Sequence, residues 1–221
     1  MKKVRFVGDI HGKFTQYQSV VQSAAASVQV GDFGVGFPGQ AVWDRQVQDW
    51  FQANPNHRFI RGNHDNPGSC KANPGWIQDG KHEGDVMYIS GAWSIDHAWR
   101  TPGKTWWPDE ELSTEELYQI YDSYMLHKPQ IVITHDCPEA VSYELFIKSS
   151  ASQFGQTQIP TRTAQALQSM WEAYKPKLWI FGHWHKTCDR VMLRTRFISL
   201  DELDHVDVDL TTAAVFWDKD I

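Results

Sequence analysis

The chain has 221 residues, 41% hydrophobic and 22% charged, which are the proportions of an ordinary globular protein. A chain of this length buries enough surface to form a core without disulfides, so a single domain over residues 1–221 is expected. The net charge of −6, with no basic run, argues against a broad nucleic-acid-binding surface. It does not exclude a small anionic substrate held at a local cluster of metal ions.

The cysteines and the first residues bear on the compartment. The three cysteines, Cys70, Cys137 and Cys188, lie far apart and form no CxxC pair, which favours a reducing environment. Charges appear too early in the first nine residues for a signal peptide, and no apolar run approaches membrane-spanning length. We therefore predict a cytoplasmic protein without membrane association, and the sequence leaves its oligomeric state open.

Short apolar runs and amphipathic stretches alternate over the first sixty residues. Residues 4–7, 28–30 and 58–60 are short apolar runs that predict strands, and residues 14–25 and 42–51 have apolar side chains at helical spacing. The order of these elements is strand, helix, strand, helix, strand. Such alternation is typical of an α/β fold.

The second half of the chain continues the pattern and ends in strands. Residues 86–90 predict a fourth strand, and residues 93–109, rich in Trp, Pro and Gly, form a loop long enough to be functional. Ser113 and Glu116 match a capping box ahead of a helix. The remaining elements are a strand at 131–133, a helix at 161–174, a strand at 178–181 and antiparallel strands within 190–217.

This order of elements predicts an α/β sandwich with mixed sheets inside and helices outside. The chain has no internal repeat and no clear linker. We therefore expect one domain, in which residues 93–126 form a loop–helix insertion that borders a cleft.

Polar residues follow five of the predicted strands, where each strand ends. In open α/β sheets, ligands bind outside the carboxyl ends of the strands, so five such ends can converge on one crevice. Where two polar residues are spaced i, i+2, an extended backbone directs both side chains the same way. The clusters in chain order are Asp9 with His11, Asp32, Asn63 with His64, His135, and His183 with His185.

The residue types in these clusters suit metal ions. Carboxylate and amide oxygens and imidazole nitrogens, without cysteine, favour Mn, Fe, Zn or Ni over a soft thiolate site. Each cluster alone has an ordinary alternative: Gly31-Asp32 is a common turn, and a strand-end histidine such as His135 is often a hydrogen-bonded surface residue. The conjunction of all five clusters, in this order, favours a metal site.

The conjunction resembles the calcineurin-like metallophosphoesterase superfamily. The resemblance covers residues 8–185 and rests on five motifs: Gly8-Asp9-Ile10-His11-Gly12, Gly31-Asp32, Gly62-Asn63-His64-Asp65, Thr134-His135 and Gly182-His183-Trp184-His185. It implies a four-layer α–β–β–α sandwich with two mixed sheets and a dinuclear metal centre between the strand ends.

The resemblance also implies a role for each site residue. One metal would be held by Asp9, His11, Asp32 and His185, and the other by Asp32, Asn63, His135 and His183, so that Asp32 bridges them. The implied reaction is hydrolysis of a phosphate ester by a metal-bound hydroxide, since two cations lower the pKa of a shared water. His64 would lie near the phosphate and protonate the leaving group or bind a phosphate oxygen.

The second motif departs from that of the phosphoprotein phosphatases, which have Gly-Asp-x-x-Asp-Arg-Gly. Here the stretch is Gly31-Asp32-Phe33-Gly34-Val35-Gly36, which lacks both the Asp that orients the catalytic histidine and the phosphate-binding Arg. Asp65 and Asp136 are candidates for the orienting role, and each also suits a turn cap. Arg61 and Arg100 are candidates for phosphate contact, with a packed or salt-bridged surface residue as the alternative for each.

Three functions are weighed against these observations. The leading hypothesis is a metal-dependent hydrolase of a phosphodiester or small phosphomonoester, such as a nucleotide. The second is a phosphoprotein phosphatase, which the missing Asp and Arg of the second motif weaken. The third is a non-catalytic binding module on the same fold, which the intact ligand set and the presence of His64 disfavour.

Overall fold

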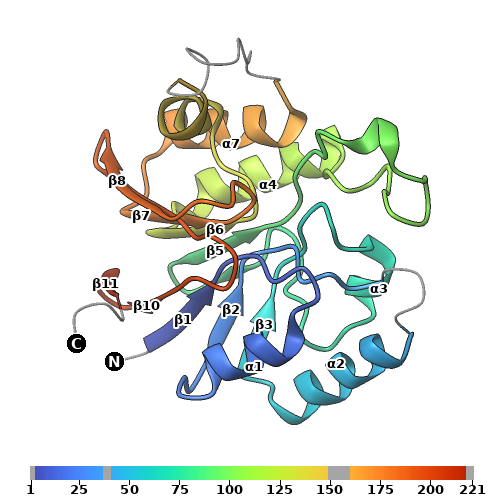
Figure 1. Ribbon diagram of the computed structural model, residues 1–221. Coiled ribbons are helices and arrows are strands. Elements are labelled where there is room, and N and C mark those ends of the chain that lie inside the picture. Colours follow the sequence, from blue (N-terminus) through green and yellow to red (C-terminus); the bar gives the residue numbers. More distant parts are fainter. Residues whose placement is uncertain (1–2, 37–40, 149–159, 218–221) are drawn as a thin grey trace.

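A computed structural model of the protein describes residues 3–36, 41–148 and 160–217. Two β-sheets stack face to face and helices cover both outer sides (Figure 1). The first sheet has the strand order β11-β10-β1-β2-β3, and the second sheet has the order β4-β5-β6-β7-β9-β8. The predicted four-layer α–β–β–α sandwich with two mixed sheets is confirmed.

The first sheet is built around three parallel strands joined by helical crossovers, as parallel pairing requires. A C-terminal hairpin adds two more strands, since β10 pairs antiparallel with β1 and β11 pairs antiparallel with β10. The strands are β1 (Lys3–Val7), β2 (Ser27–Gln29), β3 (His57–Phe59), β10 (His205–Asp209) and β11 (Ala214–Phe216).

The second sheet has four parallel strands in its middle and an antiparallel strand at each edge. The parallel strands are β5 (Val86–Ile89), β6 (Ile131–Thr134), β7 (Leu178–Phe181) and β9 (Thr195–Ser199). The edge strands are β4 (His82–Glu83) and β8 (Cys188–Met192). The tail therefore contains the predicted antiparallel strands, although β8–β9 and β10–β11 belong to different sheets and β9 also pairs parallel with β7.

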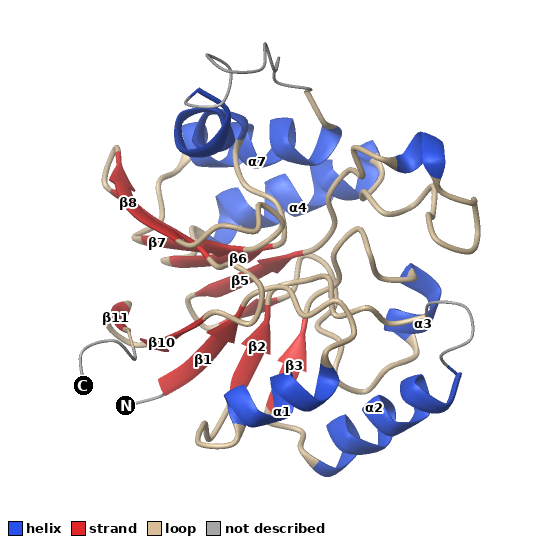
Figure 2. Cartoon of the chain, in the orientation of Figure 1, coloured by secondary structure: helices blue, strands red, loops and turns tan. Residues whose placement is uncertain are grey.

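Helices α1 (Phe14–Val21) and α2 (Ala41–Ala53) cover the first sheet, and α4 (Thr114–His127) and α7 (Arg162–Ala173) cover the second (Figure 2). Helix α4 begins with the predicted capping box, in which the Ser113 hydroxyl accepts from the Glu116 N–H and the Glu116 carboxylate accepts from the Ser113 N–H. The shorter helices are α3 (Pro67–Lys71), η1 (His97–Trp99), α5 (Glu139–Ser142) and η2 (Tyr143–Ile147).

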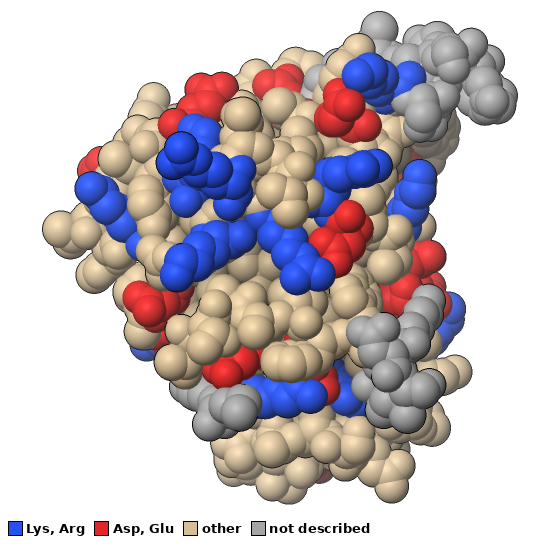
Figure 3. Space-filling model, turned by 90° about the vertical axis from the view of Figure 1, so that its left-hand side faces the viewer, with Lys and Arg blue, Asp and Glu red and all other residues tan. Residues whose placement is uncertain are grey.

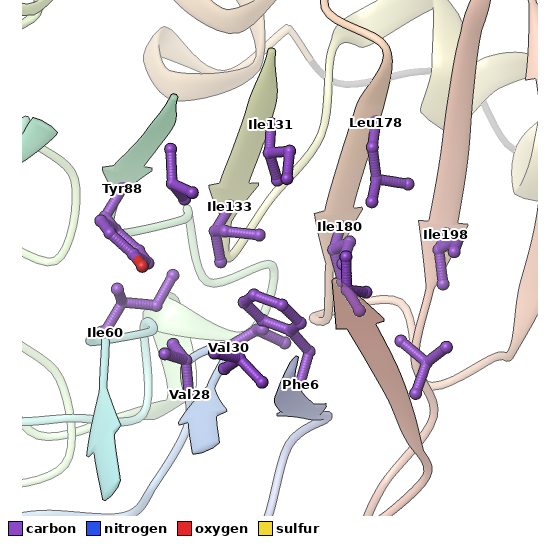
Figure 4. Close-up of a cluster of buried hydrophobic side chains, with 14 of the residues drawn as sticks. Phe6, Val28, Val30, Ile60, Tyr88, Ile131, Ile133, Leu178, Ile180 and Ile198 are labelled. Atoms are coloured by element: carbon purple, nitrogen blue, oxygen red, sulfur yellow. The ribbon is translucent and has the colours of Figure 1, made fainter. Parts of the chain in front are cut away.

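The core lies in three layers, one between the sheets and one beneath each helical layer. Between the sheets, Phe6 and Val28 of the first sheet meet Ile133 and Ile180 of the second (Figure 4). Strands covered on both faces read as continuous apolar runs, which is why the sequence predicts β1, β6 and β7 closely. This packing fixes the two sheets against each other and thereby fixes the positions of their strand ends.

The sequence prediction was wrong about the end of the first helix and omitted several short elements. Helix α1 ends at Val21, before the predicted end at residue 25, because the chain turns there to enter β2. The Arg5 guanidinium stabilises this turn by donating to the Val20 carbonyl (2.7 Å) and to the Ser23 hydroxyl (3.1 Å). Short elements such as α3 and β4 have too few residues to show a periodicity.

The remaining sequence predictions concern membrane spans, the cysteines and the distribution of charge. None of the described helices is long and apolar enough to cross a bilayer. The three cysteines are free, and Cys70 and Cys137 are buried. Charge is unevenly distributed, since Lys and Arg side chains gather in a band on the face that carries the β8 edge (Figure 3). The absence of a broad nucleic-acid-binding surface stays a prediction.

The ion pair between Arg5 and Asp207 makes stability depend on pH. Arg5 is buried and donates from Nε and Nη2 to both Asp207 oxygens (2.8 and 3.1 Å), and Lys3 adds a contact at 3.1 Å. Burial raises the pKa of Asp207, but the hydrogen bonds from Arg5 and Lys3 outweigh it and hold the pKa below its usual range. The carboxylate therefore stabilises the fold above the unfolded-state pKa of about 4, and this contribution is lost as the pH falls through the lower folded-state pKa.

We expect Asp207→Asn to lower the free energy of unfolding by about 2 kcal/mol at pH 7, because the buried Arg5 guanidinium loses its partly buried carboxylate partner. The difference from wild type should stay constant down to about pH 5 and shrink below about pH 4. Urea unfolding at several pH values measures it, with the exposed Asp49→Asn as control. An equal difference at pH 7 and pH 3 would contradict this explanation.

Candidate metal centre

The carboxyl ends of five parallel strands meet at one edge of the sandwich, three from the first sheet and two from the second. Asp9, Asp32 and Asn63 follow β1, β2 and β3, and His135 and the pair His183 and His185 follow β6 and β7. Side-chain atoms of all seven predicted ligands lie within 4.0 Å of another member of the set. Residues distant in sequence are thus brought together as predicted.

The first group of ligand atoms consists of Asp9, His11 and His185. The Nε2 atoms of His11 and His185 lie 3.2 Å apart, and His185 Nε2 lies 3.2 Å from Asp9 Oδ2. Among the described residues, the buried Asp9 Oδ2 has no donor in hydrogen-bonding geometry. A buried carboxylate oxygen facing two imidazole nitrogens is a fitting cradle for a cation.

The second group consists of Asn63, His135 and His183. Asn63 Oδ1 lies 3.0 Å from His135 Nε2 and 3.0 Å from His183 Nδ1. Asp32 lies between the two groups, because its Oδ1 is 3.3 Å from His135 Nε2 and its Oδ2 is 4.0 Å from His11 Nε2. Asp32 is therefore placed to contribute to both groups.

The spacing of these atoms fits common coordination. Ligand atoms about 2.1 Å from a shared ion and at right angles to one another lie about 3.0 Å apart. Four separations within the two groups, 3.0 to 3.2 Å, are close to that value, whereas Asp9 Oδ2 and His11 Nε2 lie 3.8 Å apart. The contact from Asp32 Oδ1 to His135 Nε2 is 3.3 Å. Carboxylate, amide and imidazole donors also match the metals predicted from the sequence.

The hydrogen bonds of His135 show why this site attracts positive charge. Its Nδ1–H donates to the Val30 carbonyl (2.9 Å), so the lone pair on Nε2 faces Asn63 Oδ1, another acceptor. Burial alone lowers the pKa of His135, but the Asp32 and Asp9 carboxylates raise it to about 10. His135 Nε2 and Asn63 Oδ1 therefore need a proton or a cation between them. Metal-binding histidines commonly show this pattern, in which one ring nitrogen donates to a carbonyl and the other faces the ion.

Four of the nine non-glycine residues with positive φ in the described part of the chain are predicted ligands. His11, Asp32, His183 and His185 all have positive φ, at 43°, 57°, 65° and 45°. Residues other than glycine rarely adopt positive φ, and such backbone strain is typical of functional sites. The extended i, i+2 geometry predicted for His11, His183 and His185 was therefore wrong, since left-handed turns direct these side chains to the centre.

Two glycines are required by the close approach of the chain. A side chain at Gly62 would collide with Asp32 Oδ1, and a side chain at Gly182 would collide with Asp9 Oδ1. Asp9 Oδ1 also accepts from the His183 N–H (3.1 Å), and Asp32 Oδ1 accepts from the His64 N–H (2.7 Å). These contacts explain why the predicted motifs place glycine beside the ligands.

His64 lies beside the centre and contacts Arg100. The Arg100 Nη2 lies 2.6 Å from His64 Nε2, and Arg100 itself is held by Asp96, whose Oδ1 is 2.8 Å from its Nε. Burial lowers the pKa of His64 to about 4, with Asp32 opposing the shift and Arg100 adding to it. In this arrangement His64 is a neutral imidazole that accepts a hydrogen bond from the guanidinium.

The two carboxylates proposed to orient His64 are engaged elsewhere. Asp65 accepts four backbone N–H groups, from residues 33, 34, 35 and 62, at 2.6 to 3.1 Å. Asp136 Oδ1 accepts from the Cys137 N–H (2.8 Å) and from Trp184 Nε1 (3.1 Å). Each carboxylate ties loops of the centre together, whereas the His64 ring is contacted by the Arg100 guanidinium and packs edge-on against the His11 ring, with centroids 4.9 Å apart.

Removing the Asp65 carboxylate should destabilise the whole protein. We expect Asp65→Ala to lower the free energy of unfolding by about 3–5 kcal/mol, because four buried N–H groups lose their acceptor. Urea denaturation measures the loss. The exposed Asp49→Ala, as control, should change stability by less than about 0.5 kcal/mol, and a similarly small effect at Asp65 would contradict the assigned role.

Arg61, a candidate for phosphate contact, is held by protein groups in this structure. It is buried, and its guanidinium donates to the Glu110 carbonyl (2.7 Å) and lies 3.4 Å from Asp79. These contacts make it a structural link between β3 and the 93–112 segment. The sequence also gave no indication of Ser94 and Glu110, which connect to Asn63, because neither residue belongs to a strand-end motif.

The protein family to which the chain is similar covers the same motifs. The family model described as calcineurin-like phosphoesterase matches residues 2–187. No curated protein sequence matches the chain. The solved structures to which the chain is similar include a dimetal phosphatase from Danio rerio, with 11% identity, a TM-score of 0.53 and coverage of 93% of this chain and 91% of the other.

Two further structures show the same fold. The chain is similar to the phosphopantetheinyl hydrolase PptH from Mycobacterium tuberculosis, with 12% identity, a TM-score of 0.53 and coverage of 90% and 89% of the two chains. It is also similar to GAP50, the anchor in the inner membrane complex of Plasmodium, with 10% identity, a TM-score of 0.52 and coverage of 97% and 87%. At these identities the likeness shows the fold.

Proposed function

The chain belongs to the calcineurin-like phosphoesterase family of metal-dependent phosphoric ester hydrolases, and we propose that it hydrolyses a phosphodiester or a small, nucleotide-like phosphomonoester. The observation that carries this proposal is the pair of ligand groups joined by Asp32. The dinuclear centre of the family fits these residues. Mn, Fe, Zn and Ni are the proposed ions, and Mn is the first to test.

In the proposed assignment, one ion is held by Asp9, His11, Asp32 and His185, and the other by Asp32, Asn63, His135 and His183. When bound, the two ions supply an activated water and neutralise charge on the phosphoryl oxygens. The residues of the chain orient the ligand atoms through strained turns and fixed hydrogen bonds. The His135 Nδ1–H bond to the Val30 carbonyl, for example, keeps Nε2 directed at the centre.

His64 and Arg100 are proposed to act on the substrate. The Arg100 guanidinium is held by Asp96 near His64, where it is placed to bind a phosphate oxygen. Because His64 is neutral in this arrangement, it is proposed to donate a hydrogen bond from its ring N–H to a phosphate oxygen. The alternative, donation of a proton to the leaving oxygen, requires that the phosphate first displaces Arg100 from Nε2 and that the ring takes up a proton. Arg100 lies in the 93–126 segment, which we propose borders the cleft and supplies the cation missing from the second motif.

The proposed reaction is tested with metal-stripped protein reconstituted with Mn. Hydrolysis of p-nitrophenyl phosphate is compared with hydrolysis of bis(p-nitrophenyl) phosphate, each with and without the ion. The expected result is turnover of at least one ester that depends on the added ion. Absence of turnover of both esters, with two ions bound, would contradict hydrolysis and favour a non-catalytic binding module on the same fold.

A substitution of Arg100 distinguishes an effect on substrate binding from an effect on metal binding. We expect Arg100→Ala to lower kcat/KM by about 10–100-fold, because a charge-assisted contact to phosphate is lost. The ion stoichiometry should remain that of wild type. The control is Lys104→Ala, which removes an exposed cation of the same loop and should leave kcat/KM within about twofold of wild type. An Arg100→Ala variant with wild-type kcat/KM would rule out the substrate contact.

A further inference from the structure

A buried hydrogen-bonded chain reaches the metal centre from the 93–112 segment. Asn63 Nδ2 donates to the Ser94 hydroxyl (3.0 Å), and that hydroxyl donates to Glu110 Oε2 (2.6 Å). The Ser94 N–H donates to the other oxygen, Glu110 Oε1 (2.7 Å). All three residues are at most 3% exposed, so water does not compete for these bonds.

The direction of each bond follows from the chemistry of the groups. An ionised carboxylate only accepts, so Glu110 accepts two hydrogen bonds from Ser94, one from its N–H and one from its hydroxyl. The Ser94 oxygen is then an acceptor toward Asn63, and only the NH₂ group of Asn63 can satisfy it. The amide of Asn63 is thereby fixed in one of its two orientations.

The fixed orientation presents the Asn63 carbonyl oxygen to the centre. Oδ1 faces His135 Nε2 and His183 Nδ1, each at 3.0 Å. A flipped amide would direct its NH₂ group at these nitrogens and would repel a cation there. Glu110 is itself held in place, because Arg61 donates to its backbone carbonyl (2.7 Å).

We infer that Ser94 and Glu110 are positioning residues that select the metal-binding orientation of Asn63 and so set the affinity of the ion site formed by Asn63, His135 and His183. The inference rests on the proposed metal centre. It gives the 93–112 segment a second role, independent of the Arg100 contact with His64. Partners that orient a ligand in this way typically change metal affinity by about 10–100-fold when they are removed.

The test is calorimetric titration of Mn²⁺ into the metal-stripped full-length protein. Wild type should bind two ions, and Ser94→Ala should weaken one binding step by about 10–100-fold while the other step is unchanged. The matched control is Ser27→Ala, because Ser27 also has a buried hydroxyl bonded to two side chains, Tyr17 (3.0 Å) and His57 (2.9 Å), but lies at the amino end of β2. The Mn²⁺ affinities of both binding steps of Ser27→Ala should equal those of wild type.

A second variant covers the case in which Ser94→Ala fails to fold. Glu110→Gln keeps the side-chain volume but introduces an NH₂ donor, which competes with Asn63 for the Ser94 oxygen, so it should weaken the same step. Because Ser94 and Glu110 act on Asn63 in series, the double variant should bind Mn²⁺ as the weaker single variant does, without additive loss.

Two outcomes separate this inference from the proposed function. If wild type binds two ions and both Ser94→Ala and Glu110→Gln keep both affinities within twofold of Ser27→Ala, the positioning role is wrong and the metal centre stands. If wild type itself binds fewer than two ions, the dinuclear assignment fails, and the positioning role falls with it.

Discussion

Asp32→Asn is expected to abolish hydrolysis, lowering kcat by on the order of a thousandfold or more, and to reduce the number of bound Mn²⁺ ions below two. Asp32 is the residue shared by the two ligand groups, through Oδ1 toward His135 and Oδ2 toward His11. Asparagine keeps one ligand oxygen but removes the negative charge and replaces the second ligand oxygen with an NH₂ group. Both ion sites are therefore damaged by one substitution.

The matched control for Asp32→Asn is Asp207→Asn, which also removes a carboxylate. The Asp207 carboxylate is paired with Arg5 and Lys3 and lies outside the metal centre. Asp207→Asn should lower stability while the rate per folded molecule and the ion count stay at wild-type values. Activity and metal content by elemental analysis are measured on the same preparations. Near-normal turnover of Asp32→Asn with two ions bound would refute the bridging role.

His64→Ala is expected to keep both ions and lose about 10²–10⁴-fold in kcat, the usual contribution of a positioned acid or hydrogen-bond donor. The ring contacts Arg100 at 2.6 Å, and its Nε2 lies 4.0 Å from Asp32 Oδ2. A nitrogen that accepts from a guanidinium is poorly placed to bind a cation as well. His64 is thus assigned to the substrate side of the centre.

The alternative for His64 is a ligand role, because His11, Asp32 and His64 bring one ligand atom each within 4.8 Å of one another. Elemental analysis of His64→Ala decides between the two roles. Loss of an ion in parallel with loss of rate would make His64 a ligand. Retention of both ions with a slow rate supports its action on substrate.

Strand-end chemistry was the part of the site that the sequence predicted best. Buried parallel strands such as β1 and β6 are continuous apolar runs, so their ends are visible in the sequence. His135 directly follows β6, and Asp9 and Asp32 follow β1 and β2 within three residues. The two-sheet sandwich was also predicted and is confirmed. Convergence of the ends follows from the parallel pairing of these strands, since parallel strands share one carboxyl edge.

What the sequence did not predict depends on tertiary contacts. The role of Asp65 requires the loop after β2 to lie against the loop after β3, and no local pattern encodes that approach. Ser94 and Glu110 are sixteen residues apart and meet only because the 93–112 segment folds back on itself. Arg61 is a candidate phosphate ligand by its place in a motif, and the sequence did not predict that it is buried and donates to the Glu110 carbonyl.

The central claim is that two ions share Asp32, and anomalous diffraction from crystals grown with Mn²⁺ tests it most directly. The predicted result is two anomalous peaks about 3.5–4 Å apart, with Asp32 between them. One peak should lie among Asp9, His11 and His185, and the other among Asn63, His135 and His183. A single peak, or two peaks with Asp32 bound to only one of them, would contradict it.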